Sequence, residues 1–228
     1  MVDLHTHVLP GMDDGSQSAG ESLKMLEALG AQGITWVAAT PHFYAGENGP
    51  EVFLTRRAQA AKELRRHWRE GLPRLLLGAE VHFFEGMSRA KELEALCLEG
   101  TELLLLEMPS GVWTKRMTGE VLELCRRPGI RVLLAHIERY MDFQPPETWD
   151  RLQAAGALNQ CNAGFFLRWW TRQKARRMLE QGLVQFIASD CHNLSTRPPR
   201  LGAALKIAGA ARQRLEENVR EFLPAWEV

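Results

Sequence analysis

The sequence lacks any apolar stretch long enough to span a membrane, and its N-terminus, Met-Val-Asp-Leu-His, lacks the basic and apolar regions of a signal peptide. It also lacks net charge, because 28 Lys and Arg residues balance 28 Asp and Glu residues. No overall field therefore attracts nucleic acid or an anionic bilayer. We expect a cytoplasmic protein that binds no nucleic acid and does not insert into membranes.

Cysteine is scarce: the four residues are far apart and form no C-x-x-C pair, which excludes a thiolate zinc knuckle and a disulfide framework. They are Cys97, Cys125, Cys161 and Cys191. Two of them begin a C-x5-R pattern, typical of cysteine-dependent phosphatases, that ends at Arg131 and at Arg197. The first pattern enters a strand from a helix, and the second lacks the glycines of a phosphate-binding loop. We interpret all four as reduced, mostly buried thiols.

The sequence does contain a regular alternation of predicted strands and helices. Short runs rich in β-branched residues or leucine predict strands at residues 2–4, 34–40, 74–79, 102–106, 130–135, 157–162 and 183–189. Apolar residues three and four apart predict helices at 19–29, 51–69, 87–98, 118–126, 147–155 and 166–180, with further helix over 198–223. This order indicates a parallel sheet, either open or closed as a barrel. Because no linker or repeat interrupts it, we expect a single domain over residues 1–228.

An imidazole or a carboxylate follows six of the seven predicted strands. These residues are His5, His7, His42, Glu80, Glu107, His136, Asp190 and His192. The carboxyl ends of the strands in a parallel α/β barrel meet at one mouth, so we expect these side chains to converge. His5 and His7 are two residues apart, as are Asp190 and His192, so the two side chains of each pair face the same side of an extended chain. His67, in a charged helix, and His82 are interpreted as surface or packing residues, with a supporting role at the site left open for His82.

Mixed imidazole and carboxylate donors without a thiolate favour Mn, Fe or Zn. Carboxylates such as Glu80 and Asp190 can bridge two ions, so the pattern indicates more than one metal. Asp13-Asp14-Gly15, after the first strand, adds a further carboxylate. We favour Asp14 as the ligand, although Asp-Asp-Gly is also an ordinary turn sequence.

Taken in order, these motifs resemble those of the PHP (polymerase and histidinol phosphatase) superfamily. They are His5-Thr6-His7, Leu9-Pro10-Gly11-Met12-Asp13-Asp14-Gly15, Thr40-Pro41-His42, Gly78-Ala79-Glu80, Ala135-His136-Ile137-Glu138-Arg139-Tyr140, Asn162-Ala163-Gly164 and Ala188-Ser189-Asp190-Cys191-His192-Asn193. Within the superfamily the sequence is most similar to the CpsB/CapC type, the manganese-dependent protein-tyrosine phosphatases of bacterial capsular polysaccharide systems.

The resemblance implies a distorted (β/α)7 TIM-like barrel with about three metal ions, Mn²⁺ being the expected metal and Fe or Zn the alternatives. The implied ligands of the first ion are His5, His7, Glu80 and Asp190. Those of the second are Glu80, Glu107 and His136, and those of the third are Asp14, His42 and His192. Arg139 and Arg197 match the arginines that receive the substrate phosphate, a role that suits a guanidinium fork. The alternative for both is a surface arginine in a salt bridge.

The implied activity is hydrolysis of phosphotyrosine in a protein, with a bacterial tyrosine kinase as one candidate partner and control of exopolysaccharide synthesis as the biological role. Unaided phosphomonoester hydrolysis is very slow. Metal coordination lowers the pKa of water toward ~7 and supplies hydroxide, while the ions and arginines neutralise phosphoryl oxygens. Water or His42 then protonates the leaving phenolate, whose pKa is near ~10.

Two alternatives remain open at this stage. Histidinol phosphate or another small phosphomonoester is the alternative substrate, and a non-catalytic metal-binding module is the alternative class of protein. The resemblance assigns no role to Phe43, Tyr44, Phe83 or Trp113, which we interpret as walls of a pocket or as packing residues.

Overall fold

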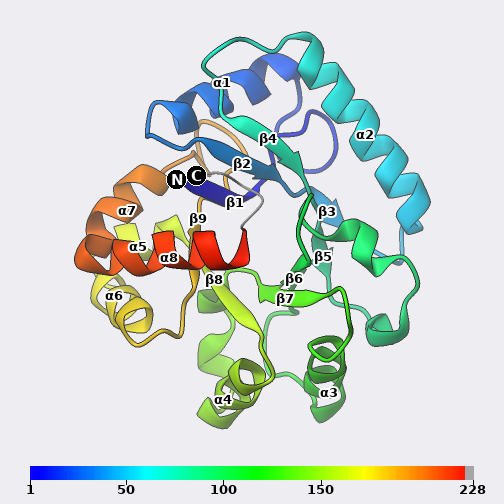
Figure 1. Cartoon of the computed structure of the whole chain (residues 1–228), viewed down its shortest axis with the longest axis vertical. Coiled ribbons are helices and arrows are strands. Elements are labelled where there is room, and N and C mark those ends of the chain that lie inside the picture. Colours follow the sequence, from blue (N-terminus) through cyan, green and yellow to red (C-terminus); the bar gives the residue numbers. More distant parts are fainter. Residues whose placement is uncertain (224–228) are drawn as a thin grey trace.

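The computed structural model describes residues 1–223, in which strands and helices alternate (Figure 1). The strands are β1 (Val2–Thr6), β2 (Trp36–Ala39), β3 (His42–Phe43), β4 (Arg74–Leu77), β5 (Glu80–His82), β6 (Leu103–Glu107), β7 (Arg131–Leu134), β8 (Leu158–Asn162) and β9 (Phe186–Ala188). They form two sheets, with orders β1-β2-β4 and β3-β5-β6-β7-β8-β9, and every pairing among them is parallel.

The sheets curl toward each other, with helices around the outside (Figure 1). The last strand approaches the first through an isolated parallel bridge between Thr6 and Cys191. The backbone N–H of Asp190 donates to the carbonyl of His5 at 2.9 Å, and that of His7 donates to the carbonyl of Cys191 at 2.9 Å. The predicted α/β class with a parallel sheet is therefore confirmed as a curled sheet.

Two short strands, β3 and β5, were not predicted, and each begins just after a predicted strand. The predicted strand 34–40 forms β2, and β3 begins after Pro41, which has no N–H to give to a sheet ladder. The predicted strand 74–79 forms β4, and β5 begins after Gly78 and Ala79; a Cβ at Gly78 would clash with the side chain of Leu98. Strand β3 pairs with β5, and this register places His42 opposite Glu80.

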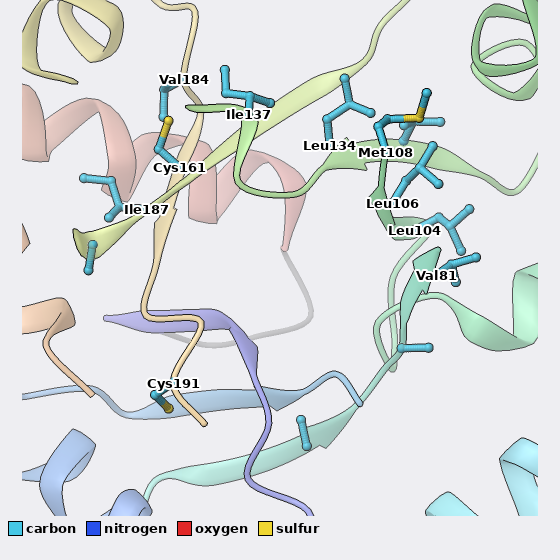
Figure 2. Packing of buried hydrophobic residues seen from close by; sticks show 14 of the residues in the cluster. Val81, Leu104, Leu106, Met108, Leu134, Ile137, Cys161, Val184, Ile187 and Cys191 are labelled. Atoms are coloured by element: carbon cyan, nitrogen blue, oxygen red, sulfur yellow. The ribbon is translucent and has the colours of Figure 1, made fainter. Parts of the chain in front are cut away.

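Alternate residues of the strands belong to different hydrophobic clusters. Leu103 and Leu105 of β6 join an inner cluster, whereas Leu104 and Leu106 join the larger cluster under the helices (Figure 2). This follows from the two-residue period of a strand that is buried on both faces. Val219 of α8 (Arg212–Phe222) belongs to the inner cluster, and the Arg131 guanidinium at the start of β7 lies over the Phe222 ring. Helix α8 therefore covers the amino ends of the strands, which leaves their carboxyl ends open.

Four of the predicted helices form within a few residues of the expected bounds. They are α1 (Ala19–Gly30), α2 (Pro50–Arg66), α3 (Lys115–Leu124) and α4 (Pro146–Ala154). Ser18 and Thr114 cap α1 and α3 by accepting hydrogen bonds from the backbone N–H groups of Glu21 and Met117. None of the helices within residues 1–223 is long and apolar enough to cross a membrane.

The other three predicted helices are wrong as continuous elements. Residues 87–98 form two short 3₁₀ helices, Met87–Arg89 and Leu93–Leu96, because Glu92 between them takes a left-handed φ of 62°. The segment 166–180 divides into α5 (Ala163–Leu167) and α6 (Arg172–Glu180), since Arg168 is extended. The terminal segment divides into α7 (Leu201–Ala208) and α8, with a φ of 57° at Gly209 between them.

Candidate metal centre

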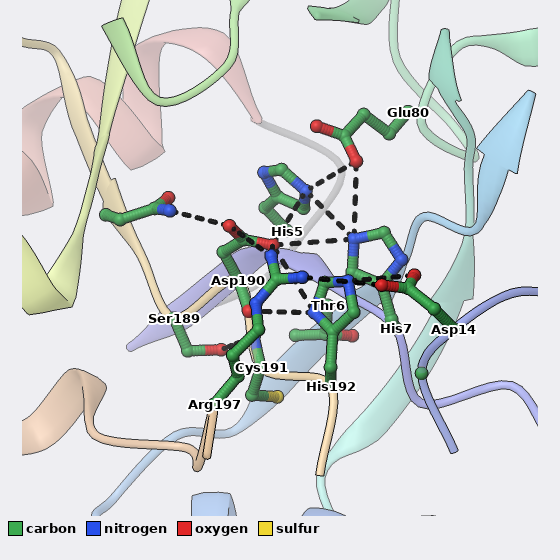
Figure 3. Close-up of polar contacts among 12 residues, drawn as sticks. His5, Thr6, His7, Asp14, Glu80, Ser189, Asp190, Cys191, His192 and Arg197 are labelled. Atoms are coloured by element: carbon green, nitrogen blue, oxygen red, sulfur yellow. Dashed lines mark hydrogen bonds and ion pairs between the residues drawn. The ribbon is translucent and has the colours of Figure 1, made fainter. Parts of the chain in front are cut away.

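The carboxyl ends of the strands bring most of the predicted ligands into one buried group (Figure 3). The first cluster contains His5, His7, Glu80 and Asp190. The Nε2 atoms of the two histidines are 3.2 Å apart, and they lie 3.2 and 3.3 Å from Oε2 of Glu80. Each is 3.5 Å from Oδ1 of Asp190. Ligand atoms about 2.1 Å from a tetrahedral ion are about 3.4 Å apart, so these spacings fit a cation.

The second cluster shares Glu80 with the first. Nε2 of His136 is 2.8 Å from Oε1 of Glu80 and 3.4 Å from Oε1 of Glu107. Glu80 therefore turns Oε2 toward the first cluster and Oε1 toward the second, the arrangement of a carboxylate that bridges two ions. Its place on β5, beside β3 and β6, puts it between the two sets of side chains.

The third cluster is the most open of the three. Oδ1 of Asp14 lies 3.4 Å from Nε2 of His42 and 3.3 Å from Nε2 of His192. The Asp14 side chain is 65% exposed, whereas that of His192 is 1% exposed. His42 also reaches back to the first cluster, because its Nδ1 is 3.0 Å from Oε2 of Glu80. The described residues thus hold all nine predicted ligands in three adjoining clusters, while their role as ligands stays a prediction.

The donor atoms in these clusters are arranged for binding divalent cations rather than for hydrogen bonding to one another. Within residues 1–223, Oε2 of Glu80, Nε2 of His192 and Nδ1 of His42 are buried and make no hydrogen bond. Buried polar atoms normally have a partner, and a cation bound by lone pairs would provide one. The donors are all nitrogen or oxygen, a set that suits Mn, Fe or Zn.

Electrostatics keep the carboxylates of the site ionised. Burial would raise the pKa of Glu80 and of Asp190, but the charge of His5 and the surrounding imidazole contacts hold both well below their usual range. Burial would lower the pKa of His7, yet its hydrogen bond to Asp13 and its contacts with Asp190 and Glu80 raise the pKa well above the usual value. The protein alone therefore gathers anionic oxygens in a buried place, which is the environment that a cation requires.

Two of the predicted ligands have an unusual backbone conformation. His136 has a φ of 32° and Asp190 has a φ of 51°, and each lies shortly after the last residue of its strand, β7 or β9. Glu92 is the only other non-glycine residue within residues 1–223 with a positive φ. Left-handed backbone turns these two side chains toward the clusters immediately after β7 and β9.

Asp13 also belongs to the candidate site, although the sequence pattern favoured its neighbour Asp14. Its Oδ2 accepts a hydrogen bond from Nδ1 of His7 at 2.7 Å and another from the backbone N–H of His42 at 3.0 Å. The first bond fixes the His7 ring so that Nε2 faces the first cluster. The Asp-Asp-Gly sequence indicated a role for a carboxylate in this loop. It supplies two: Asp13 binds the His7 ring, and Asp14 belongs to the third cluster.

Two amides on β8 complete the support. Oε1 of Gln160 lies 3.2 Å from Nδ1 of His5 and accepts from the backbone N–H of His136 at 2.9 Å. Nε2 of Gln160 donates to Asn162, whose Nδ2 donates to Oδ2 of Asp190 at 2.6 Å. This strand is the one that ends without an imidazole or carboxylate, and its amides contact three predicted ligands, which follow or belong to β1, β7 and β9.

Of the two remaining histidines, His82 lies beside the site and His67 lies on the surface, as expected. Nδ1 of His82 is 3.2 Å from Oε2 of Glu107, so His82 supports a predicted ligand of the second cluster. His67 is 54% exposed and lies 3.4 Å from Glu63 on α2, away from the clusters. Among the aromatic residues, Phe43 and Tyr44 line a cavity beside Asp14, whereas Trp113 packs on Tyr140.

Both predicted phosphate-binding arginines lie against the first cluster. Nη2 of Arg139 is 2.5 Å from Oδ2 of Asp190, and Nη2 of Arg197 is 2.8 Å from both oxygens of the same carboxylate. Their side chains are 40% and 36% exposed, so each guanidinium has one side on the cluster and one toward solvent. The salt bridges that were the alternative for these arginines do form, and they form to a predicted metal ligand.

The cysteines are unsuited to nucleophilic catalysis. Burial raises the pKa of Cys125 to about 11 and also raises the pKa of Cys191, so both are thiols at neutral pH. Figure 3 shows the Cys191 sulfur directed away from the imidazoles. This agrees with the expectation that C-x5-R is coincidental here.

We expect Asp13→Asn to lower Mn²⁺ affinity or turnover by about 10- to 100-fold, because the amide keeps the shape but loses the charge that orients the His7 ring. Calorimetric titration with Mn²⁺ and a turnover assay would measure this. Asp150→Asn, at an exposed residue of α4, is the matched control. Parent-level affinity and turnover in the Asp13 variant would show that His7 does not depend on its carboxylate partner.

Comparison with known proteins gives one consistent group of relatives. The family model "Capsular polysaccharide synthesis, CpsB/CapC" matches residues 1–223. Tyrosine-protein phosphatase CpsB of Streptococcus agalactiae serotype III is 31% identical over 221 residues, which cover 91% of this chain and 89% of that protein. Tyrosine-protein phosphatase YwqE of Bacillus subtilis is 30% identical over 204 residues, covering 86% and 79%.

Solved structures agree with the sequence relatives. One from work on YwqE of Bacillus subtilis and CpsB of Streptococcus pneumoniae, described as metal-dependent tyrosine phosphatases, superposes with a TM-score of 0.80. It is 27% identical, and the match covers 98% of this chain and 94% of that one. A putative histidinol phosphatase from Listeria monocytogenes, 12% identical with a TM-score of 0.52 over 84% of this chain and 95% of that one, shares the fold. With a family model that matches residues 1–223 and relatives of at least 30% identity along most of its length, the chain belongs to the CpsB/CapC family of capsular polysaccharide synthesis proteins.

Proposed function

We propose that this protein is a metal-dependent protein-tyrosine phosphatase. The observation that carries the proposal is the arrangement of two half-exposed arginines on Asp190, a carboxylate that also belongs to a buried group of imidazoles and carboxylates. Such a site offers cations and guanidinium groups to one phosphoryl group. Its relatives named as tyrosine-protein phosphatases support the choice of substrate.

The residues proposed to hold the ions are the three clusters. About three Mn²⁺ ions would fit, with Fe or Zn as alternatives. When bound, such ions supply Lewis acidity, which brings the pKa of water toward ~7 and offsets the phosphoryl charge. Glu80 would hold two of them together through its two oxygens. Asp13 and Gln160 would keep the rings of His7 and His5 in place by binding their Nδ1 atoms.

The roles of the remaining groups follow from their exposure. Arg139 and Arg197 would bind phosphoryl oxygens with the guanidinium edges that face solvent, and would stabilise the charge that develops there during hydrolysis. The His42 side chain is 15% exposed, whereas those of His5, His7, His136 and His192 are 0 to 1% exposed. This exposure supports a contact between His42 and the leaving phenolate, and water would supply the proton, because both ring nitrogens of His42 face predicted ligands.

Histidinol phosphate or another small phosphomonoester is the alternative substrate. Turnover of a phosphotyrosine peptide, a phosphoserine peptide and histidinol phosphate by the Mn²⁺-loaded protein would decide between them. A kcat/KM highest for phosphotyrosine supports the proposal. A kcat/KM highest for histidinol phosphate would overturn it in favour of the small-molecule reaction.

The wider setting is also proposed. The partner would be a phosphotyrosine protein of the cytoplasm, a bacterial tyrosine kinase being one candidate, and the role would be control of exopolysaccharide synthesis. We infer too that the two sheets act as one distorted (β/α)7 barrel, a reading supported by the bridge between Thr6 and Cys191. A single phosphatase domain over residues 1–228 stays a prediction.

We expect Arg139→Lys and Arg197→Lys each to lower kcat/KM by roughly ten- to a hundredfold, or about 1.4 to 2.7 kcal/mol. Lysine keeps the charge but loses the planar pair of donors that matches two phosphoryl oxygens. Steady-state kinetics with p-nitrophenyl phosphate, together with metal analysis, measures the effect, and the metal content is expected to stay at the parent level. Parent kinetics in both variants would mean that the two arginines position Asp190 by their salt bridges and do not bind the phosphoryl group.

A further inference from the structure

A cavity of about 720 Å³ adjoins the first cluster, and it is larger than a phosphoryl group requires. Asp190, Arg139 and Arg197 line it, so the cavity includes the arginines proposed to bind the scissile phosphate. The lining also contains two further arginines, Arg168 and Arg200, to which no role has been assigned. The space and the additional charges indicate that more of the substrate than its phosphotyrosine is bound here.

These two arginines reach the cavity from different parts of the chain. Arg168 directly follows α5, which begins where β8 ends, and Arg200 directly precedes α7. Helices α5 and α7 pack against each other, which brings the two positions to the same cavity. The arrangement therefore depends on the fold, since 31 residues separate the two arginines in the sequence.

The guanidinium groups of Arg168 and Arg200 are available to a ligand. Both residues are exposed, and neither side chain forms a hydrogen bond or an ion pair with another group in residues 1–223. The acidic groups in the same lining are already engaged: Asp142 pairs with Lys174 at 2.6 Å, and Glu138 accepts from the backbone N–H of Asn162 at 3.2 Å. The lining thus contains four arginines and three carboxylates, and within residues 1–223 none of these carboxylates pairs with Arg168 or Arg200.

We propose that Arg168 and Arg200 form a second anion subsite, which binds a carboxylate side chain near the phosphotyrosine of the substrate protein. The inference rests on the proposed function and deepens it, because it makes an acidic phosphotyrosine segment the preferred substrate. A guanidinium group matches a carboxylate with two parallel hydrogen bonds, and basic residues beside the site also steer an acidic segment toward it. A short acidic peptide reaches both subsites at once, whereas p-nitrophenyl phosphate reaches only the first.

The test compares two phosphotyrosine peptides that differ only in having glutamate or glutamine on both sides of the phosphotyrosine. We expect the parent protein to prefer the glutamate peptide by about tenfold in kcat/KM. This preference should decrease as the salt concentration rises, because the arginines are exposed. In the double variant Arg168→Gln/Arg200→Gln the ratio of the two kcat/KM values should fall to about one. Turnover of p-nitrophenyl phosphate normalises the rates of each variant.

Arg65→Gln, at an exposed residue of α2, is the matched control and should keep the parent ratio. A parent protein that hydrolyses p-nitrophenyl phosphate but treats the two peptides alike would overturn the subsite and leave the proposed function intact. An unchanged preference in the double variant would place the recognition elsewhere. If a second phosphorylated residue is preferred over glutamate and the double variant loses that preference, the subsite selects phosphate over carboxylate, and the carboxylate proposal is wrong. Absence of all phosphatase activity would overturn the proposed function itself.

Discussion

Replacement of Glu80 by glutamine, or of His136 by alanine, is expected to lower turnover by about a thousandfold or more. Glu80 contacts His5, His7 and His42 through one oxygen and His136 through the other, so no other carboxylate in the site touches as many predicted ligands. The amide keeps the size of the side chain but donates protons from one of the two atoms that should bind cations. Loss of a bridging ligand removes the activation of the nucleophile.

Steady-state kinetics and metal analysis of the purified variants would measure this effect, with circular dichroism to show that each variant folds. His67→Ala is the control, because that histidine is exposed at the end of α2 and, among the charged groups of residues 1–223, contacts only Glu63. It should retain the parent rate. If the Glu80 and His136 variants keep both the metal content and the rate of the parent, then the convergence of these side chains has no part in catalysis.

Removal of divalent metal is expected to abolish activity, and added Mn²⁺ is expected to restore it. The reason lies in the donors, which are all nitrogen and oxygen, and in the buried carboxylates of Glu80 and Asp190, which remain anionic at neutral pH. Metal-free protein should also unfold at a lower temperature than loaded protein, because a ligand that binds only the folded state stabilises it. Chelation followed by gel filtration, then assay and thermal melting, measures both changes.

Cys191→Ser is the control for the metal experiment, because burial keeps that thiol protonated. It should retain activity and metal dependence. Full activity of a demonstrably metal-free preparation, or loss of activity in Cys191→Ser without any response to chelator, would overturn the metal mechanism.

The sequence predicted the convergence of these side chains better than it predicted the helices. An imidazole or carboxylate after six of the seven predicted strands is a local pattern, and parallel strands place these side chains together whatever the exact strand bounds are. His5, Glu107 and Asp190 therefore lie in one place even though β3 and β5 were not predicted. Pro41 and Gly78 were visible as residue types, but the pairing of β3 with β5 is a tertiary contact that no local pattern reports.

The sequence did not reveal the groups that hold the ligands. Gln160 acts through an amide oxygen that serves a ring from one strand and a backbone N–H from another, and nothing in its own segment distinguishes it from a buried packing residue. The helix errors have a similar origin. Apolar periodicity over 87–98 continues across Glu92, whose left-handed backbone depends on the surrounding fold rather than on residue type.

At His136 and Asp190, which have left-handed backbone, a substitution that increases stability is expected to reduce activity. Such a conformation costs on the order of 1–3 kcal/mol for a residue with a β-carbon, and glycine or asparagine relieves much of that cost. A laboratory evolution experiment that rewards only thermal tolerance of the metal-free protein should therefore enrich substitutions at these two ligands and yield more robust but inactive descendants. A search for a more durable version of this protein would have to hold both residues fixed and seek its gains elsewhere in the fold.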